Sequence, residues 1–148
     1  MNLPSGLPKE VGDEELVSRF ARHASQYFKR PPFRPKRDLF MPPKDRTVLS
    51  VSRVSGLEEE VVRELGEHVV SQAGNKLYGW CTLVAGKVRS IRSLDIVSDE
   101  PDDHHHYHAH ITGFPLKLPA VVPAEKSELI QVCEDLAEAA SDMVLVQP

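Results

Sequence analysis

The first apolar pattern along the chain lies in residues 13–29 and predicts a helix. Acidic side chains occupy the start of this segment, where they interact favourably with the dipole of a helix. Its hydrophobic positions recur at helical spacing: Leu16, Phe20, Ala24 and Tyr27 or Phe28. We therefore expect one face of this segment to pack against the rest of the domain.

Two later segments also predict helices. Ser55 followed by Glu58 matches the capping-box pattern at a helix start, and Gly74 marks the expected end of that helix. Its apolar face would consist of Leu57, Val61, Leu65 and Val69. Pro123 opens a C-terminal helix. The apolar stripe of that helix is Leu129, Val132, Cys133, Leu136 and Ala140.

The remaining hydrophobic runs are short and predict strands. Residues 47–53 are rich in β-branched side chains, and residues 77–84 form an apolar run that ends before Gly86. Further strands are expected at 94–98 and 105–112, with a short one within 143–147. The order of elements predicts an α+β fold in which three helices cover a mainly antiparallel sheet of about four strands.

Length and composition favour one small globular domain. The chain has 148 residues, of which 41% are hydrophobic, and its mean hydropathy is -0.31. No apolar run approaches the roughly 18 residues that span a bilayer, and no signal peptide is recognisable, so we expect a cytoplasmic protein without a membrane partner. We expect a flexible N-terminus at residues 1–12 and a single domain at 13–148. Two cysteines are too few for a disulfide framework.

Charge is distributed unevenly along the chain. Residues 1–50 carry ten basic and six acidic side chains, whereas residues 51–148 carry eight basic and sixteen acidic ones. The basic excess is concentrated in residues 30–46, which we call the basic Pro-rich segment. Its five prolines exclude an α-helix or a central strand there. We expect an irregular but ordered arm, held on the surface by Phe33 and Phe40.

Three uses of the basic Pro-rich segment are open. It can bind an acidic partner protein, stack and pair with single-stranded nucleic acid, or dock on the acidic remainder of its own chain. None of the recognised nucleic-acid-binding motifs occurs in the sequence. We expect a partner-binding surface formed by Arg30, Phe33, Arg34, Lys36, Arg37 and Phe40.

Five of the seven histidines lie within residues 104–110. In an extended strand, His106, His108 and His110 share one face, so their imidazoles can converge on one metal ion. Asp102 or Asp103 can add an oxygen ligand, and this donor set suits zinc or another divalent transition metal. The predicted metal ligands are His106, His108, His110 and Asp103.

The His-x-His pair resembles the metal motif of cupins and carbonic anhydrases over a handful of residues. A separate triplet, His110-Ile111-Thr112, is similar to the H-x-[ST] motif of two-histidine phosphoesterases, in which histidine acts as a general acid or base. The second such triplet, which starts at His23, lies in a segment with helical periodicity. Adventitious metal binding and ordinary hydrogen bonding within the sheet are the alternative interpretations of the cluster.

Three functions follow from these patterns. The first is a small non-catalytic accessory protein that binds a protein partner through the basic Pro-rich segment. The second is a metal-dependent hydrolase that uses the histidine strand, and the third is a nucleic-acid-binding protein. No phosphate-binding loop, dinucleotide-binding motif or nucleophile elbow is present, so the sequence leaves open whether the chain is an enzyme. Pairing of the histidine strand with its twin would give a homo-oligomer.

Overall fold

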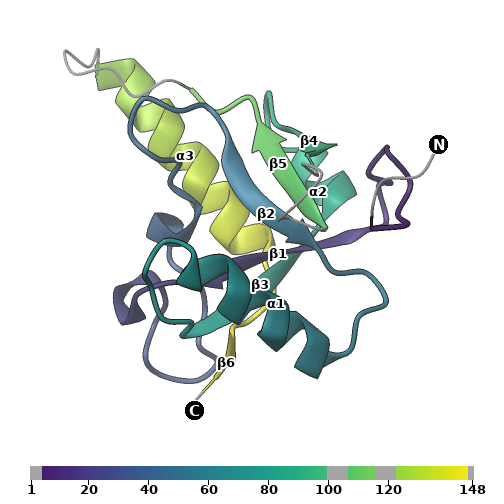
Figure 1. Cartoon of the computed structure of the whole chain (residues 1–148). Coiled ribbons are helices and arrows are strands. Elements are labelled where there is room, and N and C mark those ends of the chain that lie inside the picture. The colour runs from purple at the N-terminus through teal and green to yellow at the C-terminus, as the bar shows by residue number, and fades with distance from the viewer. Residues whose placement is uncertain (1–4, 100–106, 116–122, 147–148) are drawn as a thin grey trace.

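The computed structural model describes residues 5–99, 107–115 and 123–146 and has an α+β fold (Figure 1). Its antiparallel sheet has the strand order β4-β5-β2-β1-β3-β6. The strands are β1 (Leu16–Ala21), β2 (Leu49–Arg53), β3 (Gly79–Val84), β4 (Asp95–Ser98), β5 (His108–Thr112) and β6 (Val144–Leu145). The helices are α1 (Glu59–Ser71), α2 (Ala85–Arg89) and α3 (Pro123–Ala139), with 3-10 turns η1 (Ala24–Gln26) and η2 (Arg37–Phe40). The predicted fold class is therefore confirmed, but the sheet has six strands instead of about four.

β1 is the strand that the sequence did not predict, and the prediction of a helix over residues 13–29 is wrong. β1 lies in the interior of the sheet, with β2 on one side and β3 on the other. Because both of its faces are covered, Val17 and Phe20 are buried on opposite sides, and the strand lacks the simple alternation of a half-exposed one. Only η1 is helical in this range, and it is a single turn that follows the strand.

α1 and α3 confirm the other two predicted helices, although α1 begins later than predicted. Three of its four predicted apolar positions, Leu57, Leu65 and Val69, are partly buried against the core. The N-cap of α1 is Glu58, and the Ser55 hydroxyl instead accepts a hydrogen bond from the Leu16 backbone N–H. Val61, predicted to be on the apolar face, is 40% exposed. The buried positions of the helix are Val62, Gly66 and Val70. Within the described residues, no helix is long and apolar enough to cross a bilayer.

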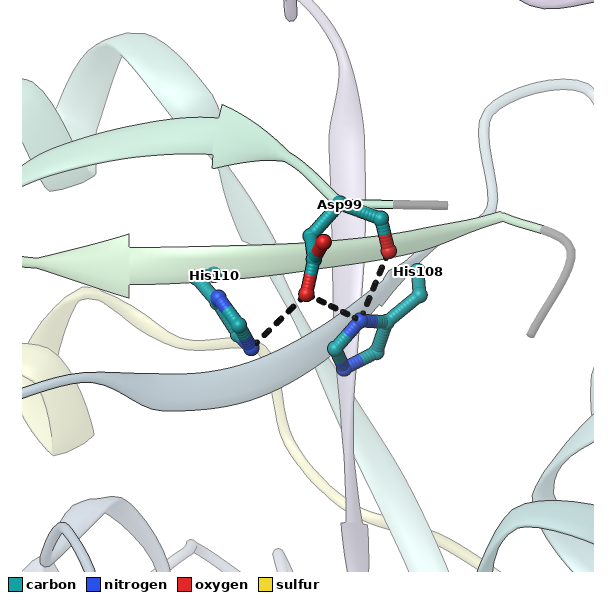
Figure 2. A group of neighbouring side chains, drawn as sticks. All are labelled: Asp99, His108 and His110. Atoms are coloured by element: carbon teal, nitrogen blue, oxygen red, sulfur yellow. Dashed lines mark hydrogen bonds and ion pairs between the residues drawn. The ribbon is translucent and has the colours of Figure 1, made fainter. Parts of the chain in front are cut away.

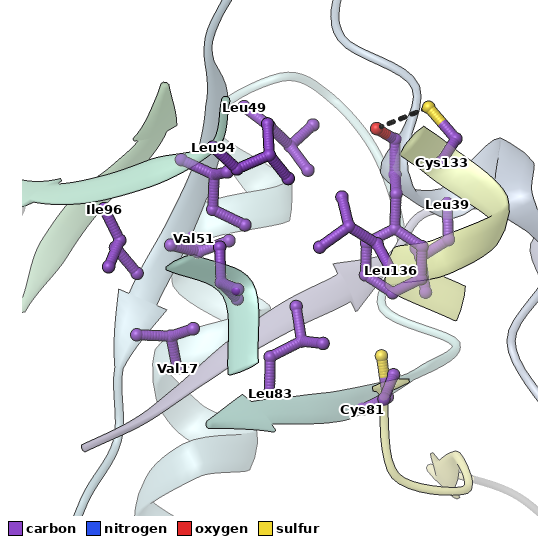
Figure 3. Packing of buried hydrophobic residues seen from close by; sticks show 14 of the residues in the cluster. Val17, Leu39, Leu49, Val51, Cys81, Leu83, Leu94, Ile96, Cys133 and Leu136 are labelled. Atoms are coloured by element: carbon purple, nitrogen blue, oxygen red, sulfur yellow. Dashed lines mark hydrogen bonds between the residues drawn. The ribbon is translucent and has the colours of Figure 1, made fainter. Parts of the chain in front are cut away.

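The core has two parts, one on each face of the sheet. Figure 3 shows the larger part, in which Val17, Leu83 and Ile96 from the strands pack with Leu136 and Cys133 of α3. The smaller part lies beneath α1 on the opposite face. Its buried members are Phe20, Val54, Val62, Val70, Leu77 and Trp80. Consequently α3 covers one face of the sheet, and α1 covers part of the other.

The basic Pro-rich segment contains η2, which packs against α3. The four residues of η2 lie between Pro35 and Pro42, where backbone N–H groups are present and one 3-10 turn can form. Phe40 is fully buried in the larger core, and Phe33 is partly buried against it. The rest of the segment has no regular secondary structure.

The N-terminal residues that precede β1 contact a buried cation. Arg53 is 1% exposed and pairs with Glu15, with its Nη2 2.9 Å from the carboxylate. The same guanidinium donates hydrogen bonds to the backbone carbonyls of Pro8 and Glu10. These bonds satisfy a charge that would otherwise be very unfavourable in the interior. The domain boundary at residue 13 stays a prediction.

Candidate metal centre

The hairpin of β4 and β5 places an aspartate against two histidines. The strands pair antiparallel, and Val97 lies opposite His110. Two pairs further along the ladder, the Asp99 backbone N–H donates to the His108 carbonyl over 3.0 Å. Asp99 therefore follows the end of β4 directly beside the first residue of β5, as Figure 2 shows.

β5 alternates between the two faces of the sheet. Ala109 and Ile111 are fully buried in the larger core, whereas His108 and His110 are half-buried on the other face. This confirms the predicted period of two for the part of the strand that the structure describes. The two histidines thus stand on the same face as α1, over the strands that α1 leaves uncovered.

The three side chains converge on a small volume. Asp99 Oδ2 lies 3.4 Å from His110 Nε2 and 3.5 Å from His108 Nδ1. The two imidazole rings meet edge to face, with their centroids 4.7 Å apart. One ligand atom from each residue can be chosen so that all three lie within 4.8 Å of one another. The arrangement therefore presents two nitrogens and one carboxylate oxygen to a common point.

Hydrogen bonding defines the protonation of His108. Its Nδ1 lies 2.9 Å from the Asp99 carbonyl oxygen, which can only accept, so Nδ1 carries the proton in this arrangement. Burial lowers the pKa of His108 below its ordinary value of 6.5, against the opposing effect of the Asp99 carbonyl. The ring is therefore mostly neutral at pH 7, which is the form that binds metals.

The observed separations fit a metal ion. Two donors bound about 2.1 Å from one tetrahedral ion lie roughly 3.4 Å apart, which matches the distance between Asp99 Oδ2 and His110 Nε2. Coordination through His108 Nδ1 would displace its proton and its contact with the carbonyl. Coordination through Nε2 would keep that contact, which is the usual way in which a ligating histidine is oriented.

A shallow recess of about 20 Å³ adjoins His108. Two arginines near the end of β1, Arg19 and Arg22, line it together with Ser52 and Val70. The Arg19 guanidinium donates hydrogen bonds to the Leu39 and Ser50 carbonyls. Burial lowers the pKa of Arg19 to about 10, so the side chain remains charged at neutral pH.

The structure brings together two of the four predicted metal ligands. His108 and His110 face the same point, whereas His106 and Asp103 lie outside the described residues. Asp99, which the sequence analysis did not select, is the carboxylate that completes the group. The sequence signal for it was the acidic stretch between two predicted strands. Only the pairing of β4 with β5 shows which aspartate of this stretch lies beside the histidines.

The residues predicted to bind a partner are largely engaged within the chain. Arg34 donates to the carbonyls of Ala137 and Ala140 at the end of α3, and Arg37 pairs with Glu134 at 2.6 Å. Of the other four, Phe40 is fully buried, Phe33 and Lys36 are half-buried, and Arg30 is exposed. These contacts are those expected if the basic Pro-rich segment docks on its own acidic chain, one of the three uses left open by the sequence.

Comparison with known proteins adds no family assignment. No protein-family model matches the chain, and neither the curated proteins nor the solved structures contain a match to it. The function is therefore inferred from the geometry of the chain itself.

Proposed function

We propose that this chain binds a divalent transition metal ion, with zinc the first candidate, through Asp99, His108 and His110, and that it acts as a metal-dependent hydrolase. The observation that carries the proposal is the convergence of three ligand atoms within 4.8 Å. Two imidazoles and one carboxylate form a donor set that zinc and iron use in enzymes.

The three ligands that the described residues supply favour catalysis over a purely structural site. Structural zinc sites are closed by four protein ligands, whereas catalytic sites keep a position for water or substrate. A metal ion bound here would supply a water of lowered pKa or polarise a carbonyl or phosphoryl group. The Asp99 side chain is 51% exposed, so one side of the group is accessible to a substrate. Arg22, which lines the recess beside His108, favours a substrate that carries negative charge.

The first test is the metal content of untagged protein, measured by elemental mass spectrometry and by titration with zinc. We expect one metal per chain. Asp99→Asn, His108→Gln and His110→Gln should each weaken zinc binding by about 100-fold or more. His68→Gln and His23→Gln are matched controls, because both histidines are exposed and lie outside the group. Equal affinity in all five variants would overturn the metal site.

A fourth ligand can be tested in the same experiment. If His106 coordinates the ion, as the sequence predicts, His106→Gln should weaken zinc binding as strongly as His110→Gln. The site would then be closed by four protein ligands, which would favour a structural role and count against hydrolysis. If His106→Gln and Asp103→Asn both behave like the control histidines, three ligands hold the ion, and an open position is available.

Hydrolysis is tested separately with chromogenic phosphomonoester, phosphodiester and carboxylic ester substrates. We expect turnover of at least one class that is abolished by a chelator, restored by zinc and lost in Asp99→Asn. Stoichiometric metal with no turnover in any class would remove the hydrolase and leave a metal-binding protein.

Binding of a protein partner by the basic Pro-rich segment is the second candidate function. One observation favours it: Phe28, which precedes the segment, is 55% exposed, and Lys36 Nζ lies 5.0 Å above its ring. A hollow of about 450 Å³ beside this ring is also lined by Arg37 and Glu134. Capture of an acidic partner that survives Lys87→Glu but is lost in Phe28→Ser and Lys36→Glu would support this function. Equal capture by all variants would contradict it.

A further inference from the structure

A second hollow lies away from the metal-ligand group, between the chain that follows β1, the start of β3 and the C-terminal strand β6. Its volume is about 360 Å³, which is within the range typical of small-ligand sites. Three aromatic residues line it: Tyr27, Phe33 and Tyr78. Lys29 and Lys76 line it too, and no carboxylate does so among the residues that the structure describes. We call this hollow the aromatic cleft.

The aromatic residues of the cleft are held by their backbones. Tyr27 forms an isolated antiparallel bridge with Pro35, which closes the loop that carries Phe33. The Phe33 N–H donates to the Arg30 carbonyl, and its own carbonyl accepts from the Met143 N–H. Tyr78 is fixed in the same way, because its N–H donates to Ala21 and its carbonyl accepts from Val146. A surface held in this way loses little freedom when it binds a ligand.

Phe33 has an unfavourable backbone conformation. Its φ angle is +54°, in the left-handed region that bulky residues rarely adopt and that costs about 1–2 kcal/mol. Glycine at this position would remove the strain, so a phenylalanine here indicates that the ring itself is used. Part of that use is packing, because Phe33 is half-buried against the larger core. The ring also lines the cleft, which makes it accessible to a ligand.

Polar groups of the cleft are suited to an anion with hydrogen-bonding edges. Lys76 Nζ lies 5.8 Å from the centre of the Tyr78 ring, so cation and ring are presented together. Burial raises the pKa of Tyr27, and the neighbouring Tyr78 adds to this effect. The Tyr27 hydroxyl is therefore protonated at neutral pH and can donate to a ligand.

We propose that the aromatic cleft binds a nucleotide, with the base stacked on its rings and the phosphate paired with Lys29 and Lys76. Aromatic rings with adjacent cations are the combination that binds nucleotide units, because every base has a π-face and every unit has a phosphate. The volume suits one nucleotide. The ligand is therefore either a free mononucleotide or one unit of a single strand.

The test is calorimetric titration of the full chain with AMP, adenosine and ribose 5-phosphate. All titrations contain EDTA, so that a metal ion at Asp99, His108 and His110 cannot bind the phosphate, and failure of one site leaves the other unaffected. We expect AMP to bind with a Kd below about 1 mM and each fragment to bind at least about tenfold more weakly. A hexanucleotide that binds at least about tenfold more tightly than AMP would identify a single strand as the source of the nucleotide.

Variants separate the contributions of ring and charge. Tyr78→Leu should weaken AMP binding about tenfold, whereas Tyr78→Phe, which keeps the ring, should stay within about threefold. Lys76→Gln should weaken AMP binding about fivefold, and Lys87→Gln, a change to an exposed lysine outside the cleft, should leave it unchanged. Because Lys76 is exposed, its replacement tests the cleft even if Tyr78→Leu fails to fold.

Three results would overturn the proposal. The first is the absence of saturable binding of either AMP or the hexanucleotide up to about 5 mM. The second is adenosine binding as tightly as AMP, because the phosphate would then play no part. The third is equal AMP affinity in the wild type, Tyr78→Leu and Lys76→Gln, because the nucleotide would then bind elsewhere.

Discussion

The two thiols of the chain illustrate how burial alone determines the chemistry of a residue. Cys81 and Cys133 are both fully buried in the larger core, the first on β3 and the second on α3. The Cys133 thiol donates to the Phe40 carbonyl over 3.4 Å (Figure 3). Burial raises the pKa of each thiol to about 12, against the opposing effect of Arg19 at Cys81 and Arg37 at Cys133. Neither residue is a thiolate at neutral pH, so nucleophilic catalysis by cysteine is excluded at both positions.

We predict that neither thiol reacts with a disulfide reagent at pH 8 in the folded protein. Both should react once the chain is unfolded in guanidinium, which gives two equivalents per chain. The measurement is the thiol titre with and without denaturant. A folded protein that releases one equivalent within minutes would show that one of these positions opens to solvent.

At the scale of elements, β1 shows where periodicity fails as a predictor. Leu16, Phe20 and Ala24 recur every four residues, which is helical spacing, yet the segment is extended up to Ala21. A strand that is covered on both faces needs apolar side chains on each of them, and such a run cannot be distinguished from a helical stripe by spacing. The covering elements decide its conformation, and they come from distant parts of the chain. Strands with one open face, such as β5, were recognised correctly.

The candidate metal centre could be predicted only in part, because one of its three residues is positioned by the pairing of two strands. The alternation of β5 places His108 and His110 together, and this can be read from the strand itself. Asp99 joins them only because the hairpin pairs β4 with β5 in one particular register. A shift of one residue would turn the aspartate to the opposite face. Register depends on the turn, and composition alone does not define it.

α1 packs closely on the sheet at Gly66, and replacing this residue tests that contact. A Cβ at Gly66 would lie 2.6 Å from the ring of Phe20 and 3.1 Å from Leu77. In an isolated helix, alanine is about 1 kcal/mol more favourable than glycine. Overpacking a buried contact costs about 1–3 kcal/mol, and Phe20 is only 4% exposed, so its ring has little room to move.

We therefore predict that Gly66→Ala lowers the free energy of unfolding by about 1 kcal/mol despite its better helix propensity. The measurement is urea denaturation followed by the fluorescence of Trp80, which lies in the same part of the core. Glu64→Ala, an exposed position of the same helix, is the control and should change stability by less than about 0.5 kcal/mol. A Gly66→Ala variant more stable than the wild type would mean that the helix can move away from the sheet.

At the scale of the whole molecule, basic side chains of the N-terminal third form contacts with the acidic remainder of the chain. Arg34 and Arg37, from the basic N-terminal third, bind the C-terminal end and the exposed face of α3 in the acidic remainder. The arginine at position 34 also pairs with Asp142, which follows that helix. Cations at a helix C-terminus interact favourably with its dipole. The basic Pro-rich segment, which includes η2, thus packs against α3 as part of the fold.

β4 forms one edge of the sheet, and neighbouring side chains form hydrogen bonds with backbone groups on its outer side. Asp95 and Val97, on either side of Ile96, direct their backbone groups towards β5. The N–H and carbonyl of Ile96 therefore point away from β5, to the outside of the sheet. Its N–H donates to Asp95 Oδ1 over 2.7 Å, and its carbonyl accepts from Arg89 Nη2 over 3.0 Å. Arg89 also binds Asp95 and Asp13. These contacts occupy the outward N–H and carbonyl of Ile96, through which another strand would pair. The opposite edge, β6, is only two residues long.

The capping carboxylate predicts a modest dependence of stability on acid. The hydrogen bond from Arg89 holds the pKa of Asp95 below its ordinary value of 3.8. Its contribution is complete above that ordinary value and is lost as the pH falls through the lowered one. Because the Asp95 side chain is 60% exposed, we expect the wild type to lose at most about 1 kcal/mol more than Asp95→Asn between pH 5 and pH 2.5. Urea denaturation across this range measures it, and identical pH profiles would contradict it.

Removing both caps should convert the edge into a pairing surface. The double variant Arg89→Ala/Asp95→Ala leaves the Ile96 N–H and carbonyl without their side-chain partners, while the net charge is unchanged. Val97, which is already 44% exposed, adds apolar surface at the same strand. We predict that the double variant forms dimers or larger species in sedimentation at about 100 μM, because an uncapped edge pairs with a second copy. Lys87→Ala/Glu64→Ala removes the same two charges from exposed helical positions and should sediment as the wild type does. If both double variants sediment alike, the side-chain caps do not control association at this edge.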